Sequence, residues 1–576
     1  MRIGLLKRIT IALFLFLIAS LAYNQVIRGP YYFQLSQNNR IKLIKMDAPR
    51  GFIYDRQGRV VAGLRLVFNV AVLPQEVEDI KKTIAAISPL AGVSESALMQ
   101  YYKNNFFAPF LPVVILHDVP KEKAILLECQ EFRIPGLLIQ TQPLRNYPYG
   151  KSISHLLGYL GKITKEELRQ LKEYGVWDRD ILGRTGVEGQ LDPFLRGQTG
   201  GRQIEVNNRG RQVRELGVKQ PLPGEDLYLT IDAELQALIG RLMEGHSGAC
   251  VVLDPRNGEI LAMVSEPSFD PQIFVMALNN KTEAARTVSR YLSSGEGVLV
   301  NRAISGAYPA GSIFKIVVAV AGLETNAITP NSTTQCTGSI RVGNRSFNCW
   351  KLDGHGTENI YTALAHSCNV FFYRLGLALG PDKIALFARS FGLGERSGID
   401  LSAEAAGNVP SKIWKLKTKK EKWYDGETAN LAIGQGYLLV TPLQMARLIA
   451  AIANGGYRVR PHLVKKFEDK ETAVVREKLA LKPSTLEVIR EGMRMVVQND
   501  DGTGHRAYIS GVQWAAKTGT AQAGTGTAHG WFGGFYPFHD PRLAIVVFLE
   551  HGGSGGDVPA LIAREIVEYF RTNKVN

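Results

Sequence analysis

The stretch GSIFKIVVAVA at residues 311–321 decides most about the fold and the chemistry of this chain. Ser312 and Lys315 are three residues apart, so on a helix they share one face and lie one turn apart. Residues 316–321 are apolar on every side, which predicts that this helix is buried. Burial favours the neutral form of a lysine, because an ammonium ion loses its hydration there. The stretch therefore predicts a serine nucleophile that Lys315 can deprotonate.

A second short motif, Ser367-Cys368-Asn369, follows further along the chain. Because Ser367 and Asn369 bracket Cys368, both can point to one side while the cysteine points to the other. Ser367 can then relay a proton towards a leaving group, and the amide of Asn369 can hold the backbone of a substrate. Alone, the tripeptide is more typical of a plain turn, so its meaning depends on the other motifs.

The third motif, Lys517-Thr518-Gly519-Thr520, is expected on a strand. Lys517 would supply a positive charge, Thr518 or Thr520 could hold a carboxylate, and Gly519 would let a substrate lie close against the strand. The backbone N–H groups of Ser312 and Thr520 are the expected donors to an oxyanion. The three motifs stand in the order found in penicillin-binding proteins and serine β-lactamases, which transfer acyl groups through a serine.

Length and composition set the frame for these motifs. A chain of 576 residues is too long for one ordinary domain, so at least two are expected. Its 45% hydrophobic and 21% charged residues are typical of globular proteins. The net charge of +15 indicates an anionic partner. The sequence has no zinc-finger spacing, RNP motif or Walker loop, so a membrane surface or cell-wall polymer is favoured over nucleic acid.

The N-terminus indicates the compartment. Arg2, Lys7 and Arg8 precede an apolar run at residues 9–23, which is short for a membrane span and long for the core of a signal peptide. The basic flank predicts a cytoplasmic N-terminus, with the rest of the chain on the outer side. No second apolar run of spanning length follows. A cleaved signal peptide and a single-pass anchor both fit this pattern.

The order of predicted elements divides the chain into three segments. Residues 1–24 hold the cytoplasmic tail and the apolar helix. Residues 25–225 read as short mixed elements with frequent breaks, which predicts an irregular α+β domain. Its last part, residues 207–225, is rich in Arg, Gly and Pro and is interpreted as a linker. In residues 226–576, strands at both ends enclose a largely helical middle, which predicts an α/β domain with one antiparallel sheet flanked by helices.

Cys336, Cys349, His355 and Cys368 have the spacing C-x12-C-x5-H-x12-C. These four soft ligands could hold one structural, four-coordinate zinc ion. Cys368 lies on the side of the second motif that faces away from substrate, so a metal there would brace the loop that carries Ser367. Two alternatives stay open: a disulfide between Cys336 and Cys349, which an oxidising compartment favours, and buried free thiols.

Six stretches around the three motifs carry a resemblance to a known family: residues 49–56, 183–188, 254–255 with 258–262, 268–271, 308–312, and 434–437 with 441–444. With them, the chain resembles the class B penicillin-binding proteins over nearly its whole length, and among these the cell-elongation type. The resemblance implies an uncleaved anchor in the bacterial cytoplasmic (inner) membrane, a non-catalytic pedestal (dimerisation-type) domain, and a serine β-lactamase-like transpeptidase domain outside. It also implies a zinc at positions matching the cysteine cluster, although some members carry carboxylates at the first two.

The resemblance further implies the reaction and the partners. Ser312 would attack the D-Ala–D-Ala carbonyl of a peptidoglycan stem peptide, and a neighbouring stem peptide would take the acyl group. β-Lactams would acylate the same serine. The expected protein partners are a membrane-embedded glycosyltransferase of the SEDS type and other proteins of the elongation complex.

Other functions remain possible at this point. A division-specific class B transpeptidase shares the chemistry, a β-lactamase or carboxypeptidase would need efficient attack by water, and a penicillin sensor would not be an enzyme. His529 precedes a predicted strand near the third motif, and is interpreted either as lining the site or as a plain loop histidine.

Overall fold

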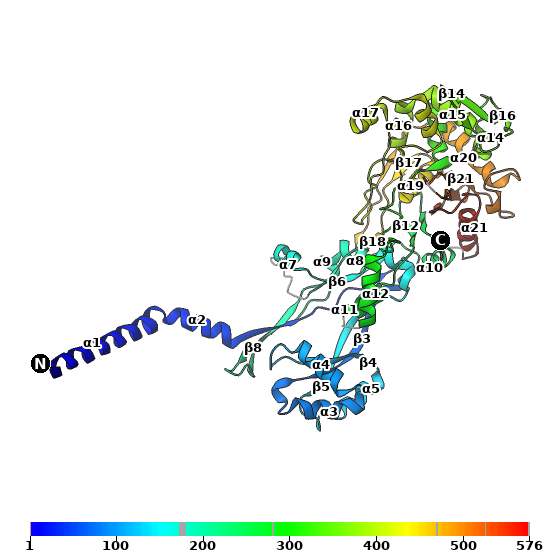
Figure 1. Ribbon diagram of the computed structural model, residues 1–576. Helices are drawn as coiled ribbons and strands as arrows, with labels where there is room; N and C mark the ends of the chain where they lie inside the picture. The colour runs from blue at the N-terminus through cyan, green and yellow to red at the C-terminus, as the bar shows by residue number, and fades with distance from the viewer. Residues whose placement is uncertain (1, 172–179, 279–281, 468–469, 525, 574–576) are drawn as a thin grey trace. The chain divides into compact units, whose positions relative to one another are not determined.

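The computed structural model describes residues 2–171, 180–278, 282–467, 470–524 and 526–573 (Figure 1). They form two compact units, each described here by itself. The first consists of Met1–Arg50, Leu64–Leu144 and Arg196–Gly224. The second consists of Gly51–Gly63, Arg145–Leu195 and Glu225–Asn576. The units divide between Gly224 and Glu225, where the sequence also places a boundary, but two earlier pieces of chain, Gly51–Gly63 and Arg145–Leu195, belong to the second unit.

The chain begins with a long apolar helix. α1 (Arg2–Ala22) continues into the π-helical turn Tyr23–Ile27, and Ile3–Ile27 is a 25-residue segment long and apolar enough to cross a membrane. A helix of that length spans about 37 Å. The membrane-spanning candidate is longer than the apolar run at residues 9–23, because the helix also includes apolar residues before and after that run. In the described part of the chain, no other helix meets the same test.

Two sheets contribute strands to the first unit. One is antiparallel and consists of β1 (Ile41–Met46), β8 (Gly200–Val206) and β9 (Gln212–Lys219). The other strands of this unit, β4 (Val113–Val119) and β5 (Leu137–Asn146), pair with β3 (Val60–Val72) and are part of a seven-stranded sheet. Besides α1, the described residues of this unit form the helices α2 (Gly29–Arg40), α3 (Ile80–Ala91), α4 (Glu95–Asn105) and α5 (Lys121–Glu128). One apolar core joins the second sheet to three of them through Ile84, Leu98, Ile115 and Leu127.

The segment interpreted as a linker is partly a strand. β9 occupies residues 212–219 and pairs with β8 along its length. Its side chains are mostly exposed, and charged ones pair across the ladder, Arg214 with Glu205 at 2.5 Å and Glu215 with Arg202 at 2.7 Å. A strand that buries so little has the polar composition of a linker, which is why the prediction was wrong for these residues.

A five-stranded antiparallel sheet is the centre of the second unit. Its order is β12 (Ile260–Glu266), β11 (Gly248–Leu253), β23 (Leu543–Leu549), β22 (His529–Tyr536) and β21 (Ala515–Ala521). The first two strands and the last three are separated by more than two hundred residues, as the predicted fold requires. β21, which carries the third motif, is an edge strand.

Helices cover both faces of this sheet. On one face, α10 (Ala233–Leu242) and α21 (Val558–Asn573) share an apolar core with Trp514, Phe532 and Val547. On the other face lies α19 (Pro442–Ala453), every residue of which is buried. Gly533 faces α19, since a Cβ there would lie 3.3 Å from Ile449. The α/β fold with a flanked antiparallel sheet is confirmed.

The remaining elements of the second unit surround this centre. Its further helices are α6 (Ser154–Leu157), α7 (Lys165–Leu171), α8 (Gly186–Gln190), α9 (Asp192–Leu195), α11 (Pro271–Leu278), α12 (Thr282–Ser293), α13 (Lys315–Glu324), α14 (Ile360–Ala365), α15 (Asn369–Leu379), α16 (Pro381–Ser390), α17 (Lys412–Lys419), α18 (Asp425–Ala432) and α20 (Pro483–Gln498). Its short strands are β2 (Ile53–Tyr54), β6 (Leu160–Lys162), β7 (Ile181–Gly183), β10 (Leu227–Leu229), β13 (Thr334–Cys336), β14 (Ser339–Val342), β15 (Arg345–Asn348), β16 (Gly356–Glu358), β17 (Tyr457–Val459), β18 (Val464–Phe467), β19 (Lys470–Glu471) and β20 (Arg476–Lys478).

Candidate active site

Ser312 lies in a tight turn beside the edge strand of the sheet. The turn is the 3-10 helix Gly311–Phe314, and the α-helix α13 begins only at Lys315. Gly311 has φ +57, and a Cβ there would lie 2.9 Å from the carbonyl oxygen of Thr520. Its N–H donates to the carbonyl of Gly434 at 2.9 Å. Glycine is therefore required for the turn to approach β21, and the half-buried Ser312 stands next to the third motif.

Lys315 connects the first motif to the second. Its side chain is fully buried, and its Nζ donates to the carbonyl oxygen of Ser367 at 2.7 Å, to Ser367 Oγ at 3.2 Å and to Asn369 Oδ1 at 2.7 Å. Burial lowers the pKa of Lys315 to about 7. Among the described residues, the hydrogen bonds of Lys315 Nζ go to the second motif and not to Ser312.

The second motif presents its backbone and side chains to Lys315. Ser367 has φ +54, a left-handed conformation that is rare for a residue other than glycine. This conformation turns its carbonyl oxygen towards Lys315, and Asn369 starts α15 directly afterwards. The buried thiol of Cys368 belongs to a separate cluster of cysteines. Ser367 and Asn369 thus both face Lys315, while Cys368 faces the cysteine cluster, as the sequence predicts.

The third motif lies on β21 with its charged residue inside. Lys517 is fully buried, and its Nζ donates to the carbonyl of Thr518 at 3.1 Å. Burial first, and then the charge of Lys315, hold the pKa of Lys517 well below its usual range. Thr518 is buried and Thr520 is exposed. Two lysines of one site are thus buried close together, where the repulsion between their positive charges is strong. An anionic substrate would reduce that repulsion.

Gly519 has a role in packing within the site. A Cβ there would lie 3.0 Å from Trp531 Cβ, 3.2 Å from Ile313 Cγ1 and 3.3 Å from the carbonyl of Ala310. The space that glycine leaves free is therefore taken by the turn that carries the serine. Gly519 therefore lets β21 and that turn pack together. That it also lets a substrate lie close against the strand stays a prediction.

Thr503 joins the site without having been predicted. Thr518 Oγ1 donates to Thr503 Oγ1 at 2.8 Å, and both the hydroxyl and the backbone N–H of Thr503 donate to the carbonyl of Ala365 at 3.1 Å. Thr503 therefore ties the third motif to the segment just before the second. The only sequence signal is the glycine on each side of it, which marks a tight turn before β21.

His529 lies at the end of β22 opposite Ala521. Its Nδ1 accepts the backbone N–H of His551 at 3.1 Å, and its ring packs edge-on against Tyr308. Burial, and then the charge of His551, lower its pKa. These contacts place His529 among residues of the strand end, and none of them is with the three motifs.

The predicted metal ligands lie together next to the second motif. The ligand atoms of Cys336, Cys349, His355 and Cys368 are all within 4.8 Å of one another, and the three cysteines are buried. His355 Nδ1 is 3.6 Å from Cys336 Sγ and 3.5 Å from Cys349 Sγ. A thiolate and an imidazole on one tetrahedral zinc lie about 3.6 Å apart. The donor set and its spacing therefore fit a zinc ion.

One further contact agrees with such a site. The backbone N–H of Asn369 donates to Cys349 Sγ at 3.3 Å, as N–H groups do around metal-bound thiolates. All five cysteines are unbonded to one another in the structure.

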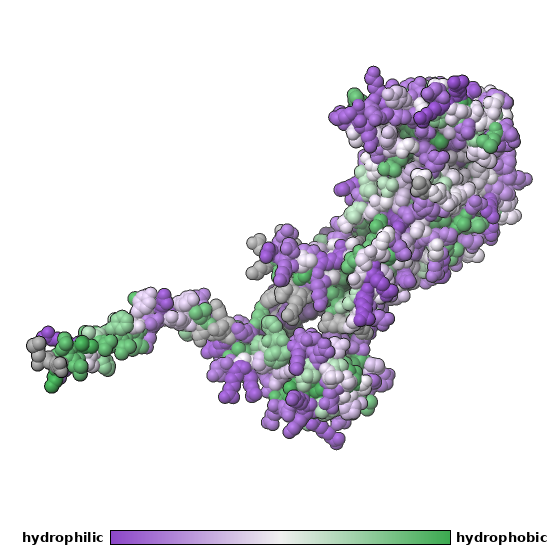
Figure 2. Space-filling model, viewed as in Figure 1, coloured by the Kyte–Doolittle hydropathy of each residue, from purple (hydrophilic) through white to green (hydrophobic). Residues whose placement is uncertain are grey.

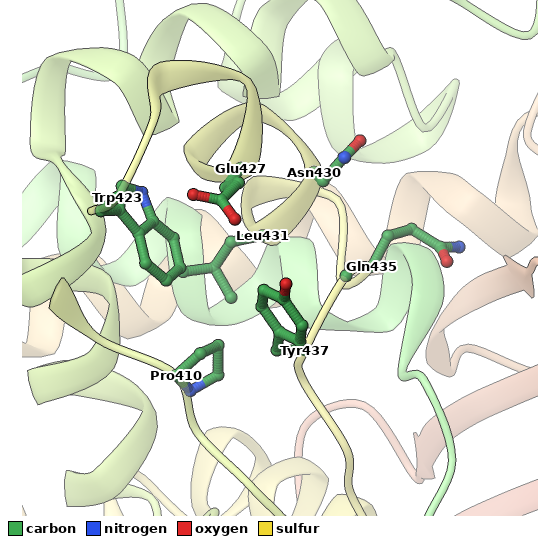
Figure 3. Close-up of a pocket in the computed structure, with 8 residues that line it drawn as sticks. Pro410, Trp423, Glu427, Asn430, Leu431, Gln435 and Tyr437 are labelled. Atoms are coloured by element: carbon green, nitrogen blue, oxygen red, sulfur yellow. The ribbon is translucent and has the colours of Figure 1, made fainter. Parts of the chain in front are cut away.

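A pocket opens beside the site (Figure 3). It has a volume of about 220 Å³ and lies between Pro410, Trp423, Glu427, Leu431 and Tyr437. None of the candidate catalytic residues is among those that line it.

Comparisons with known proteins agree with this geometry. The family model of the penicillin binding protein transpeptidase domain matches residues 248–568, and that of the penicillin-binding protein dimerisation domain matches residues 45–229. The chain is 33% identical over 584 residues to the peptidoglycan D,D-transpeptidase MrdA of Escherichia coli, which covers 96% of this chain and 91% of that protein.

Solved structures resemble the whole chain as well. The penicillin-binding protein PBP2 of Helicobacter pylori, solved in complex with MreC, has a TM-score of 0.79 and 29% identity, and the match covers 93% of this chain and 99% of that one. A chain of a peptidoglycan synthase complex, described as coordinating polymerization and crosslinking, has a TM-score of 0.76 and 32% identity, with 98% of this chain and 97% of that one covered.

Proposed function

Because the chain belongs to the class B penicillin-binding proteins, which join a dimerisation domain to a transpeptidase domain, we propose that it cross-links peptidoglycan as a serine D,D-transpeptidase during cell elongation. The observation that carries the proposal is the buried Lys315, held by the second motif one turn from Ser312 and next to the third motif.

The first step is acylation. Ser312 Oγ attacks the carbonyl of the penultimate D-alanine, and its proton passes to the neutral amine of Lys315. The N–H groups of Ser312 and Thr520 are the proposed oxyanion donors, which the contact of Gly311 with Thr520 supports. The C–N bond then breaks, and the leaving D-alanine nitrogen takes a proton through the hydroxyl of Ser367.

The second step transfers the acyl group to a new amine. An amine of a neighbouring stem peptide attacks the acyl-enzyme, loses a proton to Lys315 and forms the cross-link, which releases Ser312. Thr518, oriented by Thr503, and the charge of Lys517 hold the terminal carboxylate of the donor peptide. A β-lactam would acylate Ser312 in the same way and leave slowly, which makes this protein an antibiotic target.

The test is the release of D-alanine. A purified chain given a stem pentapeptide with a D-Ala–D-Ala end and an amine acceptor should release one D-alanine for each transfer product. Ser312→Ala should give neither. Release by Ser312→Ala at the wild-type rate would contradict the proposal, and release without any transfer product would favour a carboxypeptidase.

The relatives support an elongation role and its partners. The cited relatives are MrdA of Escherichia coli and a PBP2 solved with MreC. We infer that this chain works with an MreC-like scaffold and a membrane-embedded polymerase, and that Ile3–Ile27 anchors it in the cytoplasmic membrane with the catalytic unit outside. Depletion should round the cells, whereas filaments would point to a division enzyme.

We also propose one structural zinc ion on Cys336, Cys349, His355 and Cys368. It would brace the loop that carries Ser367 and Asn369, and it takes no part in acyl transfer. Metal analysis of the unreduced protein should find about one zinc per chain. Less than about half an equivalent, with Cys336 and Cys349 joined in the mass spectrum, would establish the disulfide instead.

A further inference from the structure

The pocket beside the active site has no part in the reaction as described above. It reaches the site through one short turn: Gly434 accepts the N–H of Gly311 at 2.9 Å, and Gln435 Nε2 donates to the carbonyl of Thr520 at 3.5 Å. α18, which forms one wall, packs on α15, whose first residue is Asn369. The turn that holds Gly311 therefore continues directly into Gln435, Gly436 and Tyr437, which line the pocket.

Large aromatic and apolar side chains form part of the pocket wall, and two of them are held in place. In Figure 3, Trp423, Leu431 and Tyr437 face a common space, while Gln435 points away from it. Trp423 Nε1 donates to Thr428 Oγ1 at 2.8 Å, and the Tyr437 ring packs on Trp414 with centroids 5.3 Å apart. Aromatic walls of this kind take up planar groups such as peptide units.

The one acidic side chain in the pocket is neutralised. Glu427 Oε1 lies 2.6 Å from Nζ of Lys415, a lysine side chain that is 2% exposed. Glu427 Oε2 also accepts the backbone N–H of Tyr424 at 2.8 Å. The carboxylate is thus occupied within the wall, and it does not repel an anion.

The rim of the pocket is strongly basic. Residues 412–422 contain six lysines and one glutamate. Lys412, Lys417, Lys419, Lys420 and Lys422 are exposed, and no ion pair of theirs appears among the described residues. Lys419 lies over the Tyr437 ring at 5.8 Å, which brings the basic segment to the pocket wall. Figure 2 shows a mainly hydrophilic surface where Figure 1 places α17.

We propose that this pocket and the lysines of residues 412–422 form a second substrate subsite, which binds the acidic part of a peptidoglycan stem peptide away from the reacting bond. This proposal rests on the proposed function, because the subsite would bind another part of the stem peptide that reacts at Ser312. A stem peptide carries carboxylates besides its terminal one, and a surplus of unpaired lysines selects for them. The aromatic walls hold the peptide units between those carboxylates and the site at Ser312.

The experiment uses two synthetic stem pentapeptides with the same D-Ala–D-Ala end. In one, the other carboxylates are free, and in the other they are amidated. KM and kcat for D-alanine release are measured with the full-length wild type and with Lys417→Glu/Lys419→Glu/Lys420→Glu. The matched control, Lys81→Glu/Lys82→Glu/Lys121→Glu, changes the net charge equally on exposed lysines of the first unit. The rate of penicillin acylation of each protein is recorded alongside.

In the triple variant Lys417→Glu/Lys419→Glu/Lys420→Glu, the KM for the acidic peptide should be about ten-fold higher than in the wild type. The KM for the amidated peptide should change less than about two-fold. The control variant should keep the wild-type KM for both. Equal effects on the two peptides, no effect on either, or the same effect in the control would each overturn the subsite. If the wild type neither releases D-alanine nor reacts with penicillin, it is the proposed function that fails.

Discussion

The side-chain nitrogen of Lys315 lies 2.7 Å from Oδ1 of Asn369, so the base of the site is held by the second motif. A neutral amine has one lone pair and two hydrogens. In the neutral form its two hydrogens go to the two nearer acceptors, Asn369 Oδ1 and the carbonyl of Ser367, both at 2.7 Å. The lone pair then serves the proton of Ser312, and the longer contact of 3.2 Å with Ser367 Oγ gives that proton a path to the second motif. The second motif thus orients the base for the first.

Replacing Lys315 should therefore abolish acylation while Ser312 is intact. We expect Lys315→Ala to lower the second-order rate constant for acylation by penicillin about a thousand-fold, the usual contribution of a positioned general base. Stopped-flow or gel-based labelling measures the rate constant. An unchanged melting temperature shows that the variant is folded, and a loss of less than about ten-fold would mean that another group takes the proton.

Thr503 should affect the rate through Thr518. Thr503→Val keeps the shape of the side chain and removes its hydroxyl, so Thr518 and the carbonyl of Ala365 lose a shared partner. We expect acylation by penicillin to fall about ten-fold, the cost of one buried hydrogen bond. Thr503→Ser should restore most of the rate, and a serine variant as slow as the valine variant would show that packing, not the hydroxyl, matters.

Gly434 and Gly511 offer a matched pair of substitutions. Both have φ +74, but a Cβ at Gly434 would lie 2.1 Å from the carbonyl of Gly311, whereas a Cβ at Gly511 would have nothing within 4 Å. Gly511→Ala should cost only the backbone strain, about 1 kcal/mol of unfolding free energy. Gly434→Ala should also displace the turn of Ser312 and lose acylation by penicillin. Equal acylation rates in the two variants would contradict this role of Gly434.

Acid should destabilise the second unit through His155. Burial lowers the pKa of His155 to about 4 in the folded chain, below the usual value of 6.5. The folded state then binds fewer protons than the unfolded one, so this stability is complete above pH 6.5 and is lost as pH falls towards 4. Between pH 8 and pH 5 the loss is about 2 kcal/mol.

His155→Gln keeps a donor for the carbonyl of Val298 and removes the titration. Urea unfolding at both pH values should show that the variant loses less stability than the wild type between them. An equal loss in both proteins would assign the acid sensitivity to other groups.

Much of the fold could be predicted because its signals are local. The runs at residues 248–253 and 543–549 are continuously apolar, as strands buried on both faces are, and the first motif is followed by an apolar helix. The linker reading failed at residues 212–219, because an exposed strand stabilised by ion pairs has no apolar pattern.

The sequence predicted those parts of the site whose residues are recognised by their type and their spacing along the chain. The four metal-ligand candidates are close in sequence and lie together in the structure. Contacts between residues far apart in the sequence could not be predicted. Thr503 donates a hydrogen bond to Ala365, 138 residues earlier, and Gly519 packs against Ile313 on another element. Such partners depend on tertiary packing, which no local pattern records.

The most direct test of the central claim is the position of the covalent adduct that penicillin leaves. The protein is labelled, digested and mapped by mass spectrometry, with Ser312→Ala as the control. The account predicts one adduct on the peptide that contains Ser312 and no labelling of the variant. An adduct on another residue, or equal labelling of Ser312→Ala, would contradict it.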